Sequence, residues 1–200
     1  MINEGIGGQE APIELERFDT DVIAEKPYLV IWQVGTNAVW QSPDLKPPPP
    51  TFDDTTKAIR DGIIKLRDET QADVILMDLQ YVPALLTPSK EHKAIAMVKA
   101  ISELARDAGV NVFRRFAFMK GLYQVEQVSF DRMVDPNDDD RLHDSDWADG
   151  ACGGGGEARD RRRRQKGMVI GNREHQLGAC YSYVAALRSN PPQSSALKKP

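Results

Sequence analysis

The chain of 200 residues has few cysteines, no long hydrophobic run and no leader pattern among its first residues. Its two cysteines, Cys152 and Cys180, are too few for a disulfide framework and lack the spacing of metal ligands. No run approaches the roughly 18 apolar residues of a membrane-spanning helix. The segment MINEGIGGQE has neither the basic nor the apolar part of a secretory signal. We therefore expect no membrane span, and these features leave the cellular location unknown.

Charge divides the sequence into two parts. The net charge is -4, but residues 151–200 contain ten basic and three acidic residues, so residues 1–150 are strongly acidic. The segments CGGGG and ARDRRRRQK in the basic part show no sustained amphipathic period, although residues 179–187 allow a short helix. We predict one folded domain over residues 1–150 and a low-complexity, disordered tail over residues 151–200.

Apolar runs and helical patterns alternate along the acidic part. Three runs are apolar at successive positions, which is typical of strands buried on both faces of a parallel sheet. They span residues 28–35, 73–80 and 110–118. Segments with a helical period precede and separate them, at residues 12–24, 53–69 and 89–108. The alternation predicts an α/β sandwich with a mainly parallel sheet, whose ligand crevice lies beyond the carboxyl ends of the strands.

The central helical segments also have recognisable ends. Residues 53–69 follow TFDD, which combines a capping residue with acidic residues at the positive end of a helix. Ile59, Ile63 and Leu66 form one apolar stripe in this segment. Gly109 is placed to end the helix over residues 89–108.

Three short stretches contain residues suited to acyl-transfer chemistry. The glycines of NEGIGGQ allow a backbone N–H to approach a substrate oxygen closely, and Asn37 in GTNA can donate a second hydrogen bond to it. Two such donors would form an oxyanion hole. His143 in DRLH can act as general base, with Asp140 holding its tautomer. Each stretch alone also has a simpler interpretation, as a turn or as a solvated acidic loop.

In combination, these stretches resemble the conserved blocks of the SGNH/GDSL hydrolases. NEGIGG resembles block II, with Asn3 and Gly8 at its two key positions, and VIWQVGTN resembles block III, with Gly35 and Asn37. DRLH resembles block V, and the longer strings look most like bacterial, rhizobial-type members. The resemblance covers about residues 2–150.

The resemblance implies a flavodoxin-like three-layer α/β/α fold and hydrolysis of a small-molecule acyl or acetyl ester without metal or cofactor. It implies the Gly8 backbone and Asn37 as oxyanion donors, His143 as base and Asp140 as its partner. It also implies that full-length relatives are exported to the periplasm or secreted. The particular ester and the oligomeric state are left open.

The sequence departs from the family pattern at two places. Ala38 stands where block III has an aspartate, which weakens the fixation of that loop. The Gly-Asp-Ser block that supplies the nucleophile does not occur, and none of Ser42, Ser89, Ser129 and Ser145 is a good substitute. We therefore expect this chain to be inactive, to lack the first strand and to be truncated before Gly-Asp-Ser. We also hypothesise that the segment after Gly150 arose from a frameshift, because the hydrophobic periodicity of helices and strands stops there.

Three other interpretations remain open. The chain could be a non-catalytic remnant or a module of the same fold that binds small ligands. A nucleic-acid contact through RDRRRR in residues 159–164 is disfavoured, because no aromatic platform or known motif accompanies the run. Calcium binding by DPNDDDR in residues 135–141 is disfavoured because an EF-hand loop needs glycine at its sixth position, so a solvated acidic loop is expected.

Overall fold

The structure is a computed structural model that describes residues 2–135, 137–138, 141 and 184–187. Its core is a five-stranded sheet in the order β1-β5-β2-β3-β4. β2 pairs in parallel with β3, and β3 pairs in parallel with β4. The strands are β1 (Ile2–Asn3), β2 (Leu29–Gln33), β3 (Asp73–Met77), β4 (Asn111–Phe113) and β5 (Val184–Leu187). This sheet and its flanking helices confirm the predicted α/β class.

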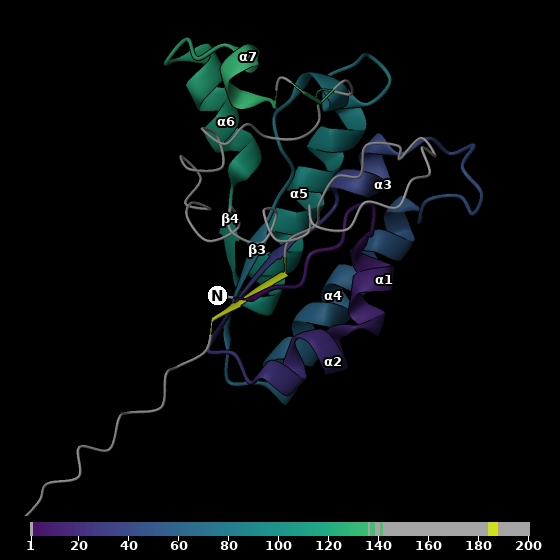
Figure 1. Ribbon diagram of the computed structural model, residues 1–200, viewed down its shortest axis with the longest axis vertical. Coiled ribbons are helices and arrows are strands. Elements are labelled where there is room, and N and C mark those ends of the chain that lie inside the picture. The colour runs from purple at the N-terminus through teal and green to yellow at the C-terminus, as the bar shows by residue number, and fades with distance from the viewer. Residues whose placement is uncertain (1, 136, 139–140, 142–183, 188–200) are drawn as a thin grey trace, which may run out of the picture.

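Strand β5 comes from the basic part of the chain and lies inside the sheet. It pairs antiparallel with β1 on one side and antiparallel with β2 on the other, so β1 runs in the same direction as β2. β5 holds the place of the first strand in the flavodoxin order 2-1-3-4-5. The sheet therefore has no gap there, and Figure 1 shows β5, in yellow, crossing it. The helix that the sequence allowed over residues 179–187 is wrong at residues 184–187, because both edges of this segment are hydrogen-bonded to strands.

The helices connect successive strands and pack against one another. α4 contacts α1, α5 and β3, and α5 contacts β4 and α3 (Figure 1). The described helices are α1 (Ala11–Glu16), α2 (Phe18–Asp21), α3 (Thr36–Trp40), α4 (Phe52–Glu69), α5 (Glu91–Ala108), α6 (Arg115–Gln124) and α7 (Phe130–Met133), with short 3-10 turns η1 (Ile23–Glu25) and η2 (Pro83–Leu85). Among the described residues, no helix has the length and apolar character needed to cross a bilayer.

The start of α4 lies within one residue of the predicted position and the end of α5 lies at it, whereas α5 begins two residues later than predicted. Thr51 caps α4 through Oγ1, which accepts from the Asp54 N–H at 3.1 Å, and Asp54 accepts from the Thr51 N–H in return. The predicted stripe of Ile59, Ile63 and Leu66 is fully buried. Gly109 ends α5 in the left-handed conformation, with φ of 71°.

The core contains a buried tryptophan between the sheet and the helices. Trp32 of β2 meets Phe18 edge to face, with ring centroids 4.8 Å apart. Its indole Nε1 donates to Glu14 Oε2 at 2.7 Å, so the polar atom of this buried ring has a partner. Because the ring also lies over Gly62 of α4, the helix approaches the sheet closely at that point.

Three details of the predicted elements are wrong. The segment at residues 12–24 forms α1, α2 and η1 instead of one helix, and Ile13 is exposed. The third strand ends at Phe113, because the apolar residues after it belong to α6. Ile95 of α5 faces solvent although it fits the apolar period. In each case the local pattern is compatible with both outcomes, and packing against the rest of the chain decides.

Candidate functional site

The candidate site lies at the carboxyl end of β2, where the chain turns sharply into α3. Gly35 has φ of +90°, a conformation that residues with a side chain rarely adopt. A Cβ at Gly35 would also lie 2.7 Å from Met97 Cγ of α5. Glycine is therefore needed here for both backbone conformation and packing. The turn places Thr36 and Asn37, both buried, at the carboxyl edge of the sheet, as the sequence predicts for GTNA.

A buried carboxylate from another segment holds this turn. Glu10 Oε1 accepts from Gly35 N at 3.0 Å and from Ala11 N at 2.9 Å, and Oε2 accepts from Ala38 N at 2.7 Å. Glu10 thereby caps α1 and the start of α3 together. Burial raises the pKa of its carboxyl group, while these backbone hydrogen bonds lower it. Fixation of the loop, expected to be weaker with Ala38, is instead supplied by Glu10.

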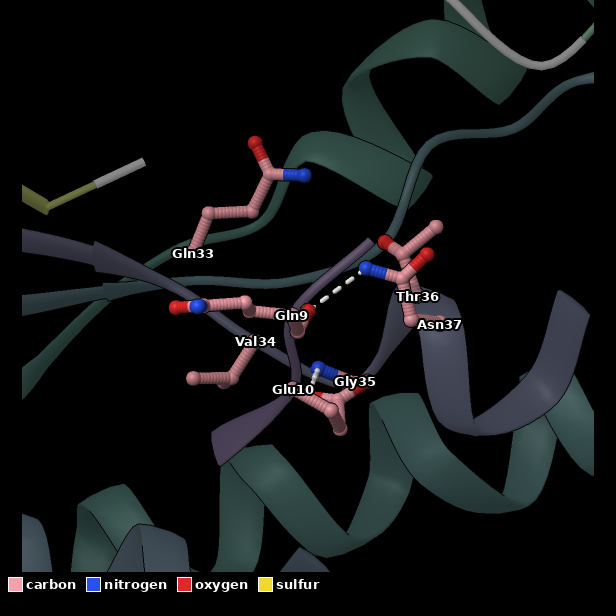
Figure 2. A pocket seen from close by; sticks show the side chains of 7 residues that line it. All are labelled: Gln9, Glu10, Gln33, Val34, Gly35, Thr36 and Asn37. Carbon is pink, nitrogen blue, oxygen red and sulfur yellow. Dashed lines mark hydrogen bonds between the residues drawn. The ribbon is translucent and has the colours of Figure 1, made fainter. Parts of the chain in front are cut away.

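The two predicted oxyanion segments are brought together by side-chain hydrogen bonds. Asn37 Nδ2 donates to Gln9 O at 2.6 Å, as Figure 2 shows, and Gln41 Nε2 donates to Gly8 O at 2.9 Å. Gly8 has φ of 80°, in the region that favours glycine. Asn37 thus bonds to the residue that directly follows Gly8, although 28 positions separate Asn37 from Gln9 in the sequence.

Polar side chains of neighbouring segments surround this turn. Arg115, the first residue of α6, donates from Nη1 to Gln33 Oε1 at 2.7 Å. Asp78, directly after β3, accepts from Phe116 N at 2.8 Å through Oδ1. Thr36 Oγ1 donates to Gln80 Oε1 at 2.8 Å. Burial raises the pKa of Asp78 to about 6, against the lowering effects of the Phe116 N–H and the Arg115 charge. Hydrogen bonds therefore connect the carboxyl ends of β2 and β3 to the start of α6.

A crevice too narrow to admit a water molecule lies among these groups, and Figure 2 shows the side chains around it. Five of the seven residues around it have polar side chains. The lining residues are Gln9, Glu10, Gln33, Val34, Gly35, Thr36 and Asn37.

The predicted site residues are brought together only in part. Gly8, Gly35 and Asn37 lie in one place, as described above. Asn3 is exposed at the end of β1, and its Oδ1 accepts from Gly5 N at 3.0 Å, which makes a local turn. Asp140 and His143 lie outside the described residues, so their position relative to Asn37 stays a prediction.

Sequence reasoning did not identify Glu10, Gln33, Asp78 or Arg115 as residues of the site. Asp78 carried a usable signal, because a carboxylate directly after a buried strand lies at the edge where ligands bind. Glu10 directly precedes Ala-Pro, a typical helix start, and so was recognisable as a capping residue. Gln33 and Arg115 carried no comparable signal.

No family model matches the chain, and no curated protein matches it significantly. Solved structures do resemble it. A catalytic variant of Axe2, an acetylxylan esterase from Geobacillus stearothermophilus, has a TM-score of 0.61 and 18% identity over 83% of this chain and 72% of that chain. LAE5, an α/β hydrolase enzyme from the metagenome of Lake Arreo, Spain, has a TM-score of 0.56 and 17% identity, over 74% and 69%. At this identity the likeness shows the fold, and it confirms the three-layer α/β architecture.

Proposed function

We propose that this chain provides the oxyanion-binding half of an ester hydrolase of the SGNH/GDSL type. The observation that carries the proposal is the hydrogen bond from Asn37 Nδ2 to Gln9 O, which joins Asn37 to the segment that contains Gly8. Backbone and carboxamide N–H groups at one point are suited to stabilise the negative oxygen of a tetrahedral acyl intermediate. The esterase fold of the structural neighbours supports this assignment.

The proposed reaction is acyl transfer from a small-molecule ester through a serine nucleophile. His143 would take the proton of the serine hydroxyl as that oxygen bonds to the carbonyl carbon, and would then pass the proton to the leaving alcohol. Asp140 would hold the His143 tautomer. Gly8 N–H and the Asn37 amide would donate to the oxyanion while the carbonyl double bond is opened, and release it when the bond re-forms.

The nucleophile is the part that the printed sequence does not supply. No Gly-Asp-Ser motif occurs, and the Ser42 hydroxyl, close to Asn37 in sequence, is exposed and bonded to Asp44. We therefore propose that this chain alone does not hydrolyse esters. In the flavodoxin order a strand carrying Gly-Asp-Ser would lie between β1 and β2, which is the place of β5.

Hydrolysis of p-nitrophenyl acetate tests the proposal. With the 200-residue chain, nitrophenol should be released no faster than in buffer alone. The chain extended at its N-terminus by a strand ending in Gly-Asp-Ser should hydrolyse the ester. In the extended protein, His143→Ala should lower kcat by about 10³-fold or more. The same extension with alanine in place of its serine is the matched control. A folded extended protein with no activity would contradict the proposal.

The occupied slot between β1 and β2 favours a second candidate, a non-catalytic module that binds small oxygen-rich ligands. With β5 paired on both sides, the sheet needs no further strand there. This candidate predicts that the extended protein stays inactive while the segment around Gly8 and Asn37 still binds acetate. The same nitrophenyl assay, combined with an acetate titration, separates the two candidates.

A further inference from the structure

A groove on the helical face of the molecule has no part in the proposed ester hydrolysis. It lies between α1, the first turns of α4 and the proline-rich segment that precedes α4, and Figure 1 shows α1 and α4 side by side. Its volume of about 580 Å³ falls within the range of about 300–1,000 Å³ that small-molecule sites have. The groove therefore has the room for a ligand that the crevice beside Asn37 lacks.

Apolar residues form more than half of the groove lining. Five of the nine lining residues are apolar, and two of these, Leu15 of α1 and Ala58 of α4, come from the two helices. The other three are Pro12, Pro48 and Pro50. Proline has no backbone N–H, so these three residues contribute no backbone donor to the groove. A ligand in this groove meets apolar surface and few hydrogen-bond donors.

The charged side chains of the lining are mainly carboxylates. Glu16, Asp54 and Asp61 stand against the single cation Lys57, whose Nζ lies 2.5 Å from Asp61 Oδ2. The Glu16 carboxylate is exposed and has no hydrogen-bond or ion-pair partner among the residues that the structure describes. Hydrogen bonds from the hydroxyl and the N–H of Thr51 lower the pKa of Asp54, so this carboxylate stays charged in weak acid. The groove thus has an excess of negative charge and of acceptors.

The carboxylates are spread along the groove and do not meet at one point. Asp54 and Asp61 are two helical turns apart on one face of α4, about 10 Å along its axis, and Ala58 lies between them in the sequence. Glu16 lines the groove from α1. A metal ion needs three or more ligands around one point, and no such group of acidic, histidine or cysteine side chains occurs among the described residues. The spacing instead suits a ligand whose positive charges are separated by an apolar stem.

We propose that this groove binds a linear aliphatic diamine or polyamine. Its ammonium groups, which can only donate, pair with Glu16 on α1 and with the carboxylates on α4, while its methylene groups lie on Leu15 and Ala58. A peptide fits less well, because its carbonyl groups would face a lining composed mainly of acceptors. The site is independent of the proposed ester hydrolysis, since no residue of the groove belongs to the acyl site.

Backbone amide resonances of the full chain test the proposal, with 1,8-diaminooctane as the probe at constant ionic strength. In the wild-type protein, the Leu15 and Ala58 signals should shift together and saturate with one Kd. Glu16→Gln combined with Asp61→Asn removes a carboxylate from each helix. This double variant should weaken binding about three- to tenfold, as expected for two ion pairs near the surface.

Two controls separate this site from general attraction to an acidic surface. Asp68→Asn combined with Asp107→Asn removes two exposed carboxylates outside the groove and should leave the Kd unchanged. Magnesium chloride supplies the same charge of the cation without an apolar stem and should not shift the Leu15 and Ala58 signals. Equal weakening by the two double variants, equal shifts with Mg²⁺, or the absence of saturable shifts with the diamine would each overturn the proposal. If a double variant does not fold, the comparison of the diamine with Mg²⁺ on the wild type decides.

Discussion

The Glu10 carboxylate accepts a hydrogen bond from the Gly35 backbone at 3.0 Å, across 25 positions of the sequence. Through this contact the residue that starts α1 also holds the turn that presents Asn37. A single buried side chain therefore couples the two loops of the candidate site, and its removal should affect both.

Replacement of Glu10 by glutamine should destabilise the protein. The new side chain would keep one oxygen but would turn an NH2 group toward backbone N–H donors, so one or two buried hydrogen bonds are lost. We expect Glu10→Gln to lower the free energy of unfolding by about 1–3 kcal/mol. Urea denaturation measures the change. Glu16→Gln, at an exposed position of α1, should stay within about 0.5 kcal/mol of wild type. Equal effects of the two substitutions would argue against the double capping role.

Two glycine substitutions should have opposite effects on stability. A Cβ at Gly62 would lie 2.5 Å from Trp32 Cη2, and the aromatic ring cannot bend away. Gly62→Ala should therefore cost about 1–3 kcal/mol through overpacking. A Cβ at Gly121 of α6 meets nothing within 4 Å, so Gly121→Ala should stabilise by about 0.5–1 kcal/mol. Urea denaturation followed by tryptophan fluorescence measures both. A stabilising Gly62→Ala would show that α4 does not pack on Trp32 as described.

Asp78 should make the protein less stable as pH rises through weakly acidic values. Its pKa is raised from 3.8 to about 6, so between these values the folded state keeps a proton that the unfolded state has released. The Asp78 contribution is fully present below pH 3.8 and is lost as pH rises through about 6. This shift in the pKa of Asp78 corresponds to about 3 kcal/mol of unfolding free energy.

Unfolding free energies of the wild type and of Asp78→Asn, compared between about pH 4 and pH 7, isolate this contribution. The stability of the wild type relative to the variant should fall across that window, because asparagine does not titrate. Parallel pH profiles would show that the Asp78 carboxyl has the same pKa in the folded and unfolded states.

Strand β5 should protect its amides from hydrogen exchange. Ala186 pairs with Ile2 of β1 and with Val30 of β2, so the segment is hydrogen-bonded along both edges. Ala186→Pro removes an N–H from an interior strand, which proline does not tolerate, and should abolish this protection. Exchange measured by mass spectrometry or NMR tests both statements. Fast exchange of residues 184–187 in the wild type, with Val30 protected, would contradict the placement of β5.

Local patterns predicted the elements that have a strong period and clear ends. α4 begins at its Thr51 capping box, and α5 ends at Gly109, because these residues act on neighbours within one helical turn. The location of Gly35 and Asn37 at the carboxyl edge also follows from sequence, since it requires only a buried strand that runs in parallel with its neighbours. The sequence also showed that glycine and asparagine, whose N–H groups are suited to an oxyanion hole, occur in these segments.

Contacts between segments far apart in the chain could not be predicted from local sequence patterns. Arg115 meets Gln33 across 82 positions, and this contact depends on the order of the strands and on the point where β4 gives way to α6. The residues adjacent to either side chain along the sequence carry no pattern that indicates the pairing.

The α/β class, the two long helices and the candidate donors Gly8 and Asn37 were predictable from the sequence, because periodicity, capping and glycine conformations are local properties. The folded structure was needed to show that Glu10 fixes the Gly35 turn, that Arg115 bonds to Gln33 and that β5 lies between β1 and β2. The physical reason is that hydrogen bonds and strand pairs form between whichever groups the folded chain brings within reach. Separation along the sequence does not limit them.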